Sequence, residues 1–281
     1  MFAFSTYGSY LYMTYQKAIE QSKSLQVPTD VSDRYDKTAA TYDTEVNTSE
    51  WIMGLGKKRK ELVERARGNV VEVSCGTGRN IEYYQLGEKR GTDKKGKAEV
   101  IGCRSVTFVD QSGEMVEIAR EKFEKMFPAF KKAGMIAPVA FRAQDAMKPI
   151  VPAIPMARPT RLLTQSDDEK QNRFDTVIQT MGLCSHPDPV AFLKHMGTIT
   201  EPERGKILLL EHGRSYYGWV NRLLDDLAPA HADRHGCWWN RDIGEIVEKS
   251  GLEVVEAKRW HLGTTWLFIL RPSQIQKGDG E

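Results

Sequence analysis

Short apolar runs alternate along this chain with longer segments whose apolar residues recur at helical spacing, beginning near Val31. The short runs are rich in β-branched residues and predict strands near 69–74, 105–110, 137–142, 174–180, 205–211, 252–260 and 264–271. The longer segments predict helices near 48–66, 79–86, 113–126, 188–199 and 240–250. Strands that alternate with helices form a parallel sheet covered on both faces, whereas two strands without an intervening helix form an antiparallel hairpin. The pattern therefore predicts an α/β fold, a doubly wound, mostly parallel sheet of seven strands with an antiparallel last strand.

The same pattern divides the chain into an arm, a domain and a tail. Residues 1–32 hold an aromatic arm and a polar helix that ends in a linker, residues 33–272 the folded domain, and residues 273–281 a polar tail. Two segments lack periodicity and are expected to be insertions. The segment 87–103 is predicted to be a charged, glycine-punctuated loop, and the proline-rich 149–172 a mobile surface segment that is either disordered or a lid.

The residues after the first predicted strand are the most informative local sequence. The apolar run from Val70 changes at Ser74-Cys75-Gly76-Thr77-Gly78 into small residues, before a helical pattern resumes. A strand, a glycine turn and a helix start place backbone N–H groups around a ligand. The acid Glu72 on the strand disfavours a pyrophosphate and favours a ligand that carries an ammonium or another hydrogen-bond donor. A G-x-G pattern alone is also compatible with a tight turn that binds nothing.

A second acid, Asp110, ends the second predicted strand and directly precedes the predicted helix 113–126. At this position of a doubly wound sheet, a carboxylate can accept hydrogen bonds from both hydroxyls of a nucleoside ribose. The spacing from Gly78 to Asp110 exceeds the usual ~20 residues, and the loop 87–103 accounts for the excess. The two acids together predict a ligand with a ribose and a positively charged group.

Five segments, in order, resemble the motifs of class I S-adenosylmethionine (SAM)-dependent methyltransferases of the ubiquinone and menaquinone methyltransferase branch (methyltransferase type 11). They are residues 35–43, 72–80, 108–110, 144–146 and 174–180. Residues 181–186 (Met-Gly-Leu-Cys-Ser-His) and the aromatic N-terminus resemble fungal mitochondrial methyltransferase-like proteins of the Oms type, and Leu-Cys-Ser and Glu211-His212 are similar to animal thiol methyltransferases. The resemblance covers residues 33–272 and implies a Rossmann-like fold and SAM as the cofactor.

The resemblance also implies which residues contact SAM. The implied set is Tyr42, Glu72, Ser74, Cys75, Gly76, Gly78, Asn80, Asp110, Gln111, Met115, Asp145, Ala146, Gln179 and Thr180. In this set Asp145 accepts from the adenine amino group and the Ala146 N–H donates to the ring, although Asp145 is also suited to cap a turn. Serine at position 74 departs from the glycine usual in the family, which narrows the approach to the cofactor.

The acceptor is expected beyond the fifth predicted strand. The segment from Tyr216 to Trp239 is rich in aromatic residues and is predicted to roof a pocket for a small, fairly apolar acceptor, by resemblance a quinol- or phenol-like ring or a thiol. The same content also suits a membrane-facing entry, or core packing of a helix such as 219–227. His186 and His212 follow the fourth and fifth strands and are the candidate bases, with His186 favoured by its position. The alternative function is that of a non-catalytic protein with this fold, which serves as a membrane-anchored assembly or scaffolding factor.

Composition and residue spacing give no support for a nucleic-acid surface, a disulfide framework or a metal site. The chain has 281 residues with 40% hydrophobic and 28% charged residues, and its net charge of +2 gives no argument for a nucleic-acid partner. The basic run 57–60 is interpreted as the solvated start of a helix. The four cysteines are widely spaced, which indicates a reducing compartment or incidental core cysteines and not a disulfide scaffold. His231, His235 and Cys237 could supply three metal ligands, but no fourth ligand is evident, so we expect no metal site.

The N-terminus holds many aromatic residues and no charge before Lys17. At about 15 residues it is too short to cross a bilayer, which needs about 20. It is predicted to be either a segment that contacts a membrane, as the remnant of a span, or an arm packed on the domain. By resemblance the protein is mitochondrial and associated with the inner membrane, with a cytoplasmic location as the alternative. The sequence leaves the oligomeric state open.

Overall fold

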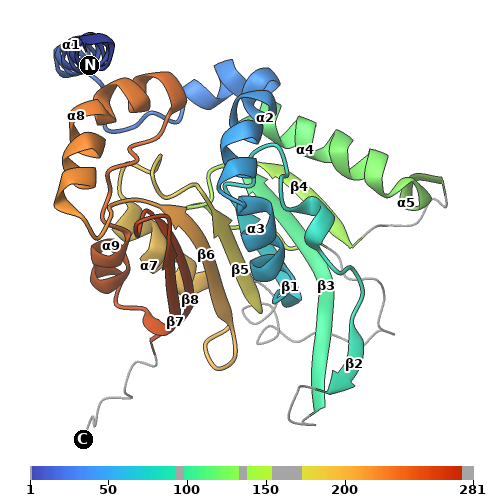
Figure 1. Cartoon of the computed structure of the whole chain (residues 1–281). Coiled ribbons are helices and arrows are strands. Elements are labelled where there is room, and N and C mark those ends of the chain that lie inside the picture. The colour runs from blue at the N-terminus through green and yellow to red at the C-terminus, as the bar shows by residue number, and fades with distance from the viewer. Residues whose placement is uncertain (1, 93–97, 133–137, 154–172, 274–281) are drawn as a thin grey trace, which may run out of the picture.

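A twisted sheet with helices against both faces forms the domain in the computed structural model, which describes residues 2–92, 98–132, 138–153 and 173–273 (Figure 1). The strands are β1 Arg67–Val73, β2 Lys89–Thr92, β3 Ala98–Asp110, β4 Val139–Ala143, β5 Thr176–Thr180, β6 Lys206–His212, β7 Glu253–Trp260 and β8 Thr265–Arg271. Their order in the sheet is β2-β3-β1-β5-β6-β8-β7, and β4 also pairs with β3. The seven expected strands are confirmed, and β2 is an addition.

The order of strands reverses at β1. This strand pairs in parallel with β3 on one side and with β5 on the other. The chain runs outward through β3 and β4, and then returns to the other side of β1 through β5 and β6. Finally β8 inserts antiparallel between β6 and β7. The doubly wound sheet with an antiparallel last strand is therefore confirmed, and a ligand crevice is expected beyond the carboxyl ends of β1 and β5.

Alternate residues of β1 enter two different cores. Val71 and Val73 pack in the core that α7 and α9 cover, whereas Val70 packs in the core that α3 and α4 cover. The bounds of the helices on the two faces are α3 Leu55–Val63, α4 Gly113–Met126, α5 Pro128–Lys132, α7 Pro189–Ile199 and α9 Ile243–Ser250. Because both faces of the central strands are buried, these strands appear in the sequence as continuous apolar runs.

Two predicted helices differ in the structure. The helix predicted over 48–66 is two helices, α2 Arg34–Ile52 and α3, because Gly54 adopts a left-handed φ of +59° and turns the chain between them. The helix predicted over 79–86 is only the 3-10 turn Ile81–Tyr83. There the Asn80 side chain donates hydrogen bonds to groups on β1 and β5, so tertiary contacts prevail over the helical pattern.

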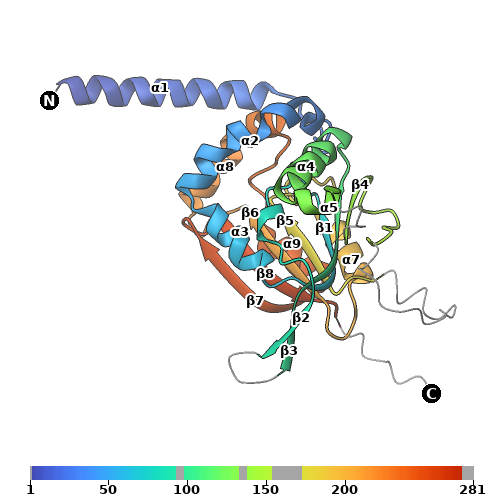
Figure 2. The same cartoon turned by 90° about the vertical axis from the view of Figure 1, so that its right-hand side faces the viewer.

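The prediction of a loop over 87–103 is wrong. β2 pairs antiparallel with the beginning of β3, and the two strands extend below the sheet as a hairpin (Figure 2). A Cβ at Gly102 would lie 2.3 Å from the carbonyl oxygen of Gly87, so glycine is required where the chain enters the hairpin. Most of the predicted proline-rich insertion and almost all of the predicted tail lie outside the described residues.

The N-terminal arm is the helix α1 Phe2–Ser24, and it contacts α8 Gly218–His235. The Ser22 hydroxyl is buried and accepts a hydrogen bond from the Ala230 N–H at 3.2 Å. The N-terminal half of α1 extends away from the domain (Figure 2), and Tyr12 there is 63% exposed. Among the residues that the structure describes, no helix is both long enough and apolar enough to span a bilayer.

Candidate active site

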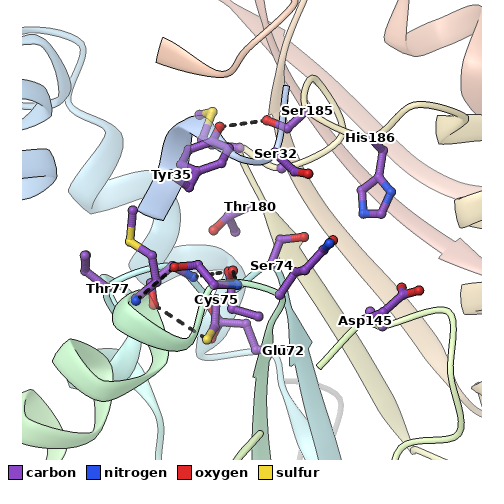
Figure 3. A pocket seen from close by; sticks show the side chains of 18 of the residues that line it. Ser32, Tyr35, Glu72, Ser74, Cys75, Thr77, Asp145, Thr180, Ser185 and His186 are labelled. Atoms are coloured by element: carbon purple, nitrogen blue, oxygen red, sulfur yellow. Dashed lines mark hydrogen bonds between the residues drawn. The ribbon is translucent and has the colours of Figure 1, made fainter. Parts of the chain in front are cut away.

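A cavity of about 460 Å³ lies beyond the carboxyl ends of the central strands, where the strand order reverses (Figure 3). Its volume is within the range of small-molecule sites. Most residues that the sequence placed at the site line it: Tyr42, Glu72, Ser74, Cys75, Gly76, Asp110, Gln111, Met115, Asp145, Ala146, Thr180 and His186. Four do not: Gly78, Asn80, Gln179 and His212.

The loop after β1 turns through two left-handed residues. Ser74 has a φ of +52° and Gly76 a φ of +53°, and the first of these is unusual for a residue with a side chain. Gly182 explains how the serine fits. A Cβ at Gly182 would lie 2.8 Å from the Ser74 Cβ, so the missing side chain leaves room for Ser74. Backbone strain is therefore located at the wall of the cavity, where such strain is commonly functional.

Asp110 joins the loops that follow β1 and β3. Its Oδ2 accepts a hydrogen bond from the Gly76 N–H at 2.8 Å, and its Oδ1 accepts one from the Ser112 N–H at 3.0 Å. Burial raises the pKa of Asp110, and the backbone hydrogen bonds oppose that rise. A carboxylate has about four acceptor positions, so these backbone bonds do not fill all of them. Asp110 is thus positioned by backbone groups while it remains able to accept hydrogen bonds from a ligand.

Asp145 and Ala146 line the cavity directly after β4. The Asp145 Oδ1 accepts from the Met147 N–H at 2.8 Å, which is the turn-capping role left open by the sequence. A carboxylate has two oxygens, and Figure 3 shows the Asp145 side chain below His186, on the same side of the view. Capping the turn and contacting a ligand are therefore compatible roles for this residue.

Glu72 lies at the floor of the cavity and is only 1% exposed. Its carboxylate accepts from the Tyr84 hydroxyl at 2.6 Å and from the Asn80 amide at 2.8 Å. Burial raises the pKa of Glu72 to about 7, although these two hydrogen bonds act in the opposite direction. Asn80 therefore lies outside the cavity lining and positions the Glu72 carboxyl group, which faces the cavity.

Arg59 is a site residue that sequence reasoning missed. The run 57–60 was interpreted as a solvated helix start, but Arg59 is 4% exposed and lines the cavity. Its guanidinium donates to the Thr180 hydroxyl at 2.6 Å and forms an ion pair with Glu50 at 2.8 Å. Helical spacing was the available signal, because the fully buried Leu62 lies three residues further on the same face of α3.

The cover of the cavity also differs from the prediction. The aromatic stretch Tyr216 to Trp239 was expected to roof it, but no residue of that stretch lines it, because the stretch largely forms α8 and packs under α1. Residues at the start of α2 and just before it cover the cavity instead: Asp30, Ser32, Asp33, Tyr35 and Asp36. The Tyr35 and Ser185 hydroxyls are 2.7 Å apart and point toward one another in Figure 3. This contact joins the cover to the loop after β5.

The two candidate bases occupy different places. His186 lines the cavity, and its ring stacks on Phe192 with the centroids 3.7 Å apart. Burial, and after it the nearby Arg241 guanidinium, lower the pKa of His186 to about 4, so its imidazole is neutral at neutral pH. His212 is outside the cavity lining, with its Nε2 2.8 Å from the Cys237 Sγ. Of the two, His186 is the one placed to act on an acceptor directly.

Two further predicted contacts lie behind the wall. A Cβ at Gly78 would lie 2.4 Å from the Ile81 side chain, so this glycine serves the packing of the turn. Gln179 is fully buried, and neither polar atom of its side chain has a hydrogen-bond partner in the described part of the chain. Its amide nitrogen lies close to Gly182, which lines the cavity. An unpartnered buried amide beside a cavity is satisfied by a bound ligand or by ordered water.

Comparison with known proteins gives a family match over most of the chain. Residues 49–257 match the profile of the family described as "methyltransferase domain". Among curated proteins, the mitochondrial methyltransferase OMS1 of Saccharomyces cerevisiae is 38% identical over 251 residues, which are 89% of this chain and 48% of that protein. The chain therefore spans about half the length of this relative.

Solved structures show the same fold at low sequence identity. An O-methyltransferase family protein from Burkholderia thailandensis superposes with a TM-score of 0.55 at 13% identity, covering 94% of this chain and 70% of that one. The N-methyltransferase NodS from Bradyrhizobium japonicum WM9, in complex with S-adenosylhomocysteine, has a TM-score of 0.51 at 10% identity, covering 87% of this chain and 100% of that one. These likenesses confirm the predicted Rossmann-like fold.

Proposed function

The chain belongs to the methyltransferase domain family, and from that membership we propose that it transfers a methyl group from SAM to a small, fairly apolar acceptor. The observation that carries the proposal is the cavity at the strand-order reversal. One side of it is formed by the loops after β1 and β3, and the other by tyrosines of α2 and by His186. A single cavity of this kind can hold a nucleoside cofactor and an acceptor side by side.

The residues of the first side fit the chemistry of SAM. Asp110 has free lone pairs for the ribose hydroxyls. Apart from its chain neighbours, no heavy atom of the described residues lies within 4 Å of a Cβ built on Gly76, so a ligand can approach the backbone there. The Glu72 carboxyl on the floor suits a donor such as the ammonium of the methionine arm, and the unpartnered Gln179 amide lies close by, behind Gly182.

The second side supports a small acceptor. Tyr35, Tyr42, Met181 and His186 give it aromatic rings, a thioether and a neutral imidazole. The hydrogen bond between Tyr35 and Ser185 joins the cover to the sheet and restricts the space available. A quinol- or phenol-like ring or an alkyl thiol suits these surfaces better than a peptide or a nucleic acid does.

This reaction requires little covalent or acid–base catalysis from the residues of the protein. Bound SAM supplies an electrophilic methyl group on a sulfonium whose leaving group is neutral. The protein therefore chiefly aligns the acceptor with that methyl group and excludes water. Where the acceptor carries a dissociable proton, the neutral imidazole of His186 accepts it.

The test combines binding and turnover. We expect SAM to bind by calorimetry, and S-adenosylhomocysteine to form with lipophilic phenols, quinols or alkyl thiols but not with tRNA or histone peptides. Tight SAM binding without turnover on any lipophilic acceptor would instead support the alternative of a non-catalytic assembly factor. Absence of SAM binding would contradict the proposed cofactor.

We further propose that the protein is mitochondrial and contacts a membrane through the exposed half of α1. The mitochondrial location of the 38% identical relative supports the first part, and the exposed side chains of Tyr7, Tyr10, Leu11 and Met13 support the second. Deletion of residues 2–14 should abolish co-sedimentation with liposomes of inner-membrane composition. Because the contacts of Ser22 with α8 remain, the melting temperature should change little. A fall of several degrees without any prior lipid binding would show that the arm belongs to the core.

A further inference from the structure

Three potential metal ligands meet behind the second side of the cavity. Cys184, His212 and Cys237 each offer one ligand atom, and these atoms all lie within 4.8 Å of one another. Both cysteines are free and buried. This is not the trio that sequence spacing offered, because the His231 ring instead stacks on Trp239 with the centroids 3.9 Å apart. Within the described part of the chain, it is the one group of this kind.

The backbone brings the three residues together from distant segments. Cys184 lies in the turn after β5, His212 ends β6, and Cys237 follows α8. α8 ends at Gly236 in the left-handed conformation, and the next residues run back to the sheet, where the Trp238 N–H donates to the Cys184 carbonyl at 3.1 Å. The donor atoms are thus held by main-chain contacts that are independent of any bond between the side chains.

The donor set matches zinc. Two thiols and one imidazole are the ligands of a Cys₂His site, in which Zn²⁺ leaves its fourth position to water or another small ligand. At Zn–S and Zn–N bonds of about 2.3 and 2.0 Å, tetrahedral geometry separates the ligand atoms by about 3.5–3.8 Å. The 2.8 Å contact between the His212 Nε2 and the Cys237 Sγ would lengthen to about 3.5 Å around such an ion.

The charge of the site also balances. Zn²⁺ displaces the protons of both thiols, and two thiolates with one divalent ion and a neutral imidazole have no net charge. Burial of a site without net charge has a much lower free-energy cost than burial of a charged one. Cys75 and Cys103 belong to no group of three potential metal ligands among the described residues.

We propose that Cys184, His212 and Cys237 form a zinc site that ties the end of α8 to the turns after β5 and β6. Ser185, next to Cys184, lines the cavity and contacts Tyr35, so the ion stabilises the wall on the acceptor side. The proposal goes beyond methyl transfer and does not depend on it, because the ion is held outside the cavity lining.

The test measures metal directly. Protein purified under reducing conditions without chelator should contain about one zinc per chain by plasma mass spectrometry. Cys184→Ala and Cys237→Ala should lose it, while Cys103→Ala, which removes a buried cysteine elsewhere, should retain it. Cys237→His keeps a ligand at the same position and should retain metal as well.

A second measurement keeps the proposal testable if an alanine variant folds poorly. Metal-free wild-type protein titrated with Co²⁺ should develop the visible bands of tetrahedral cobalt with thiolate charge transfer, and Zn²⁺ should bleach them. Absence of zinc together with a featureless Co²⁺ titration of fully reduced protein would overturn the proposal. So would retention of metal in both alanine variants. SAM calorimetry on the same samples reports separately on the proposed function.

Discussion

The two sides of the cavity are held together by different kinds of contact. On the side of β1 and β3, backbone groups make the wall, with the Cys75 N–H donating to the Val109 carbonyl at 3.1 Å and the Gly76 N–H to Asp110 at 2.8 Å. The residues involved belong to neighbouring parallel strands, so the register of the sheet places them.

On the side of α2 and the β5 loop, side chains distant in sequence make the wall. Tyr35 meets Ser185, and Arg59 meets both Glu50 and Thr180. A wall made of backbone tolerates most substitutions because main-chain hydrogen bonds survive a change of side chain, whereas a wall made of side chains depends on each of them. Substitutions on the second side should therefore have larger effects than most on the first.

The largest effect is expected at His186. With an acceptor that must lose a proton, His186→Ala should lower kcat by about 10²–10⁴-fold and leave the SAM Kd unchanged. The base must be unprotonated to act, and its pKa is lowered to about 4. The wild-type kcat should therefore not change through this group across neutral pH, and should fall only as the pH approaches 4. His261→Ala is the control, because His261 contacts Thr265 on the hairpin between β7 and β8 and is outside the cavity lining. An equal loss of kcat in both variants would refute the assignment.

Arg59 tests the side-chain wall by stability. Arg59→Met removes one of the two guanidinium partners of Glu50, since Arg79 still pairs with it at 2.9 Å, and it also removes the hydrogen bond to the Thr180 hydroxyl. The free energy of unfolding in urea denaturation should fall by about 1.5–3 kcal/mol. Lys60→Met is the matched control on the same helix, because the ion pair of Lys60 is 3.9 Å long and its side chain is 58% exposed. Similar losses in the two variants would show that the buried network contributes little.

Asp110 tests the backbone wall at the side chain that accepts the Gly76 N–H. Asp110→Ala removes hydrogen bonds to the ribose hydroxyls of about 1.5–3 kcal/mol each. Calorimetry should show SAM binding at least about tenfold weaker while circular dichroism shows a folded protein. Asp225→Ala, whose carboxylate pairs with Arg214 on the surface, should leave the SAM Kd unchanged. An unchanged Kd in Asp110→Ala would exclude the ribose contact.

The smallest effect is expected at Ser74. Ser74→Gly removes the cost of a left-handed φ for a residue with a side chain, and should raise the free energy of unfolding by about 1 kcal/mol or less. Ser74→Ala keeps the Cβ at the same φ and should show no such gain. SAM binding should be retained in both variants, since backbone groups make this wall. Destabilisation by Ser74→Gly would mean that the serine side chain itself holds the turn.

The site residues at or just after strand ends could be predicted from the strand pattern, whereas Tyr42 and Met115, which lie on helices, came only from the family resemblance. Asp110, Asp145 and Thr180 were placed correctly at the cavity because apolar runs locate the strand ends, and parallel strands bring their carboxyl ends to one edge. His212 also ends a strand but lies outside the cavity lining, since β6 is one strand further from the reversal. The position of a strand in the sheet, as well as its end, decides which residues face the ligand.

The sequence by itself determined the seven strands, their doubly wound arrangement and the glycine turn after β1, because these depend on local periodicity and on the few conformations that small residues permit. Only the tertiary structure decided that residues 30–36 cover the cavity, that Arg59 is buried in it and that Cys184, His212 and Cys237 meet behind it. These contacts join segments far apart in the chain. They depend on how helices dock across the sheet. Helical spacing can mark the buried face of α3, but it does not record which groups that face meets.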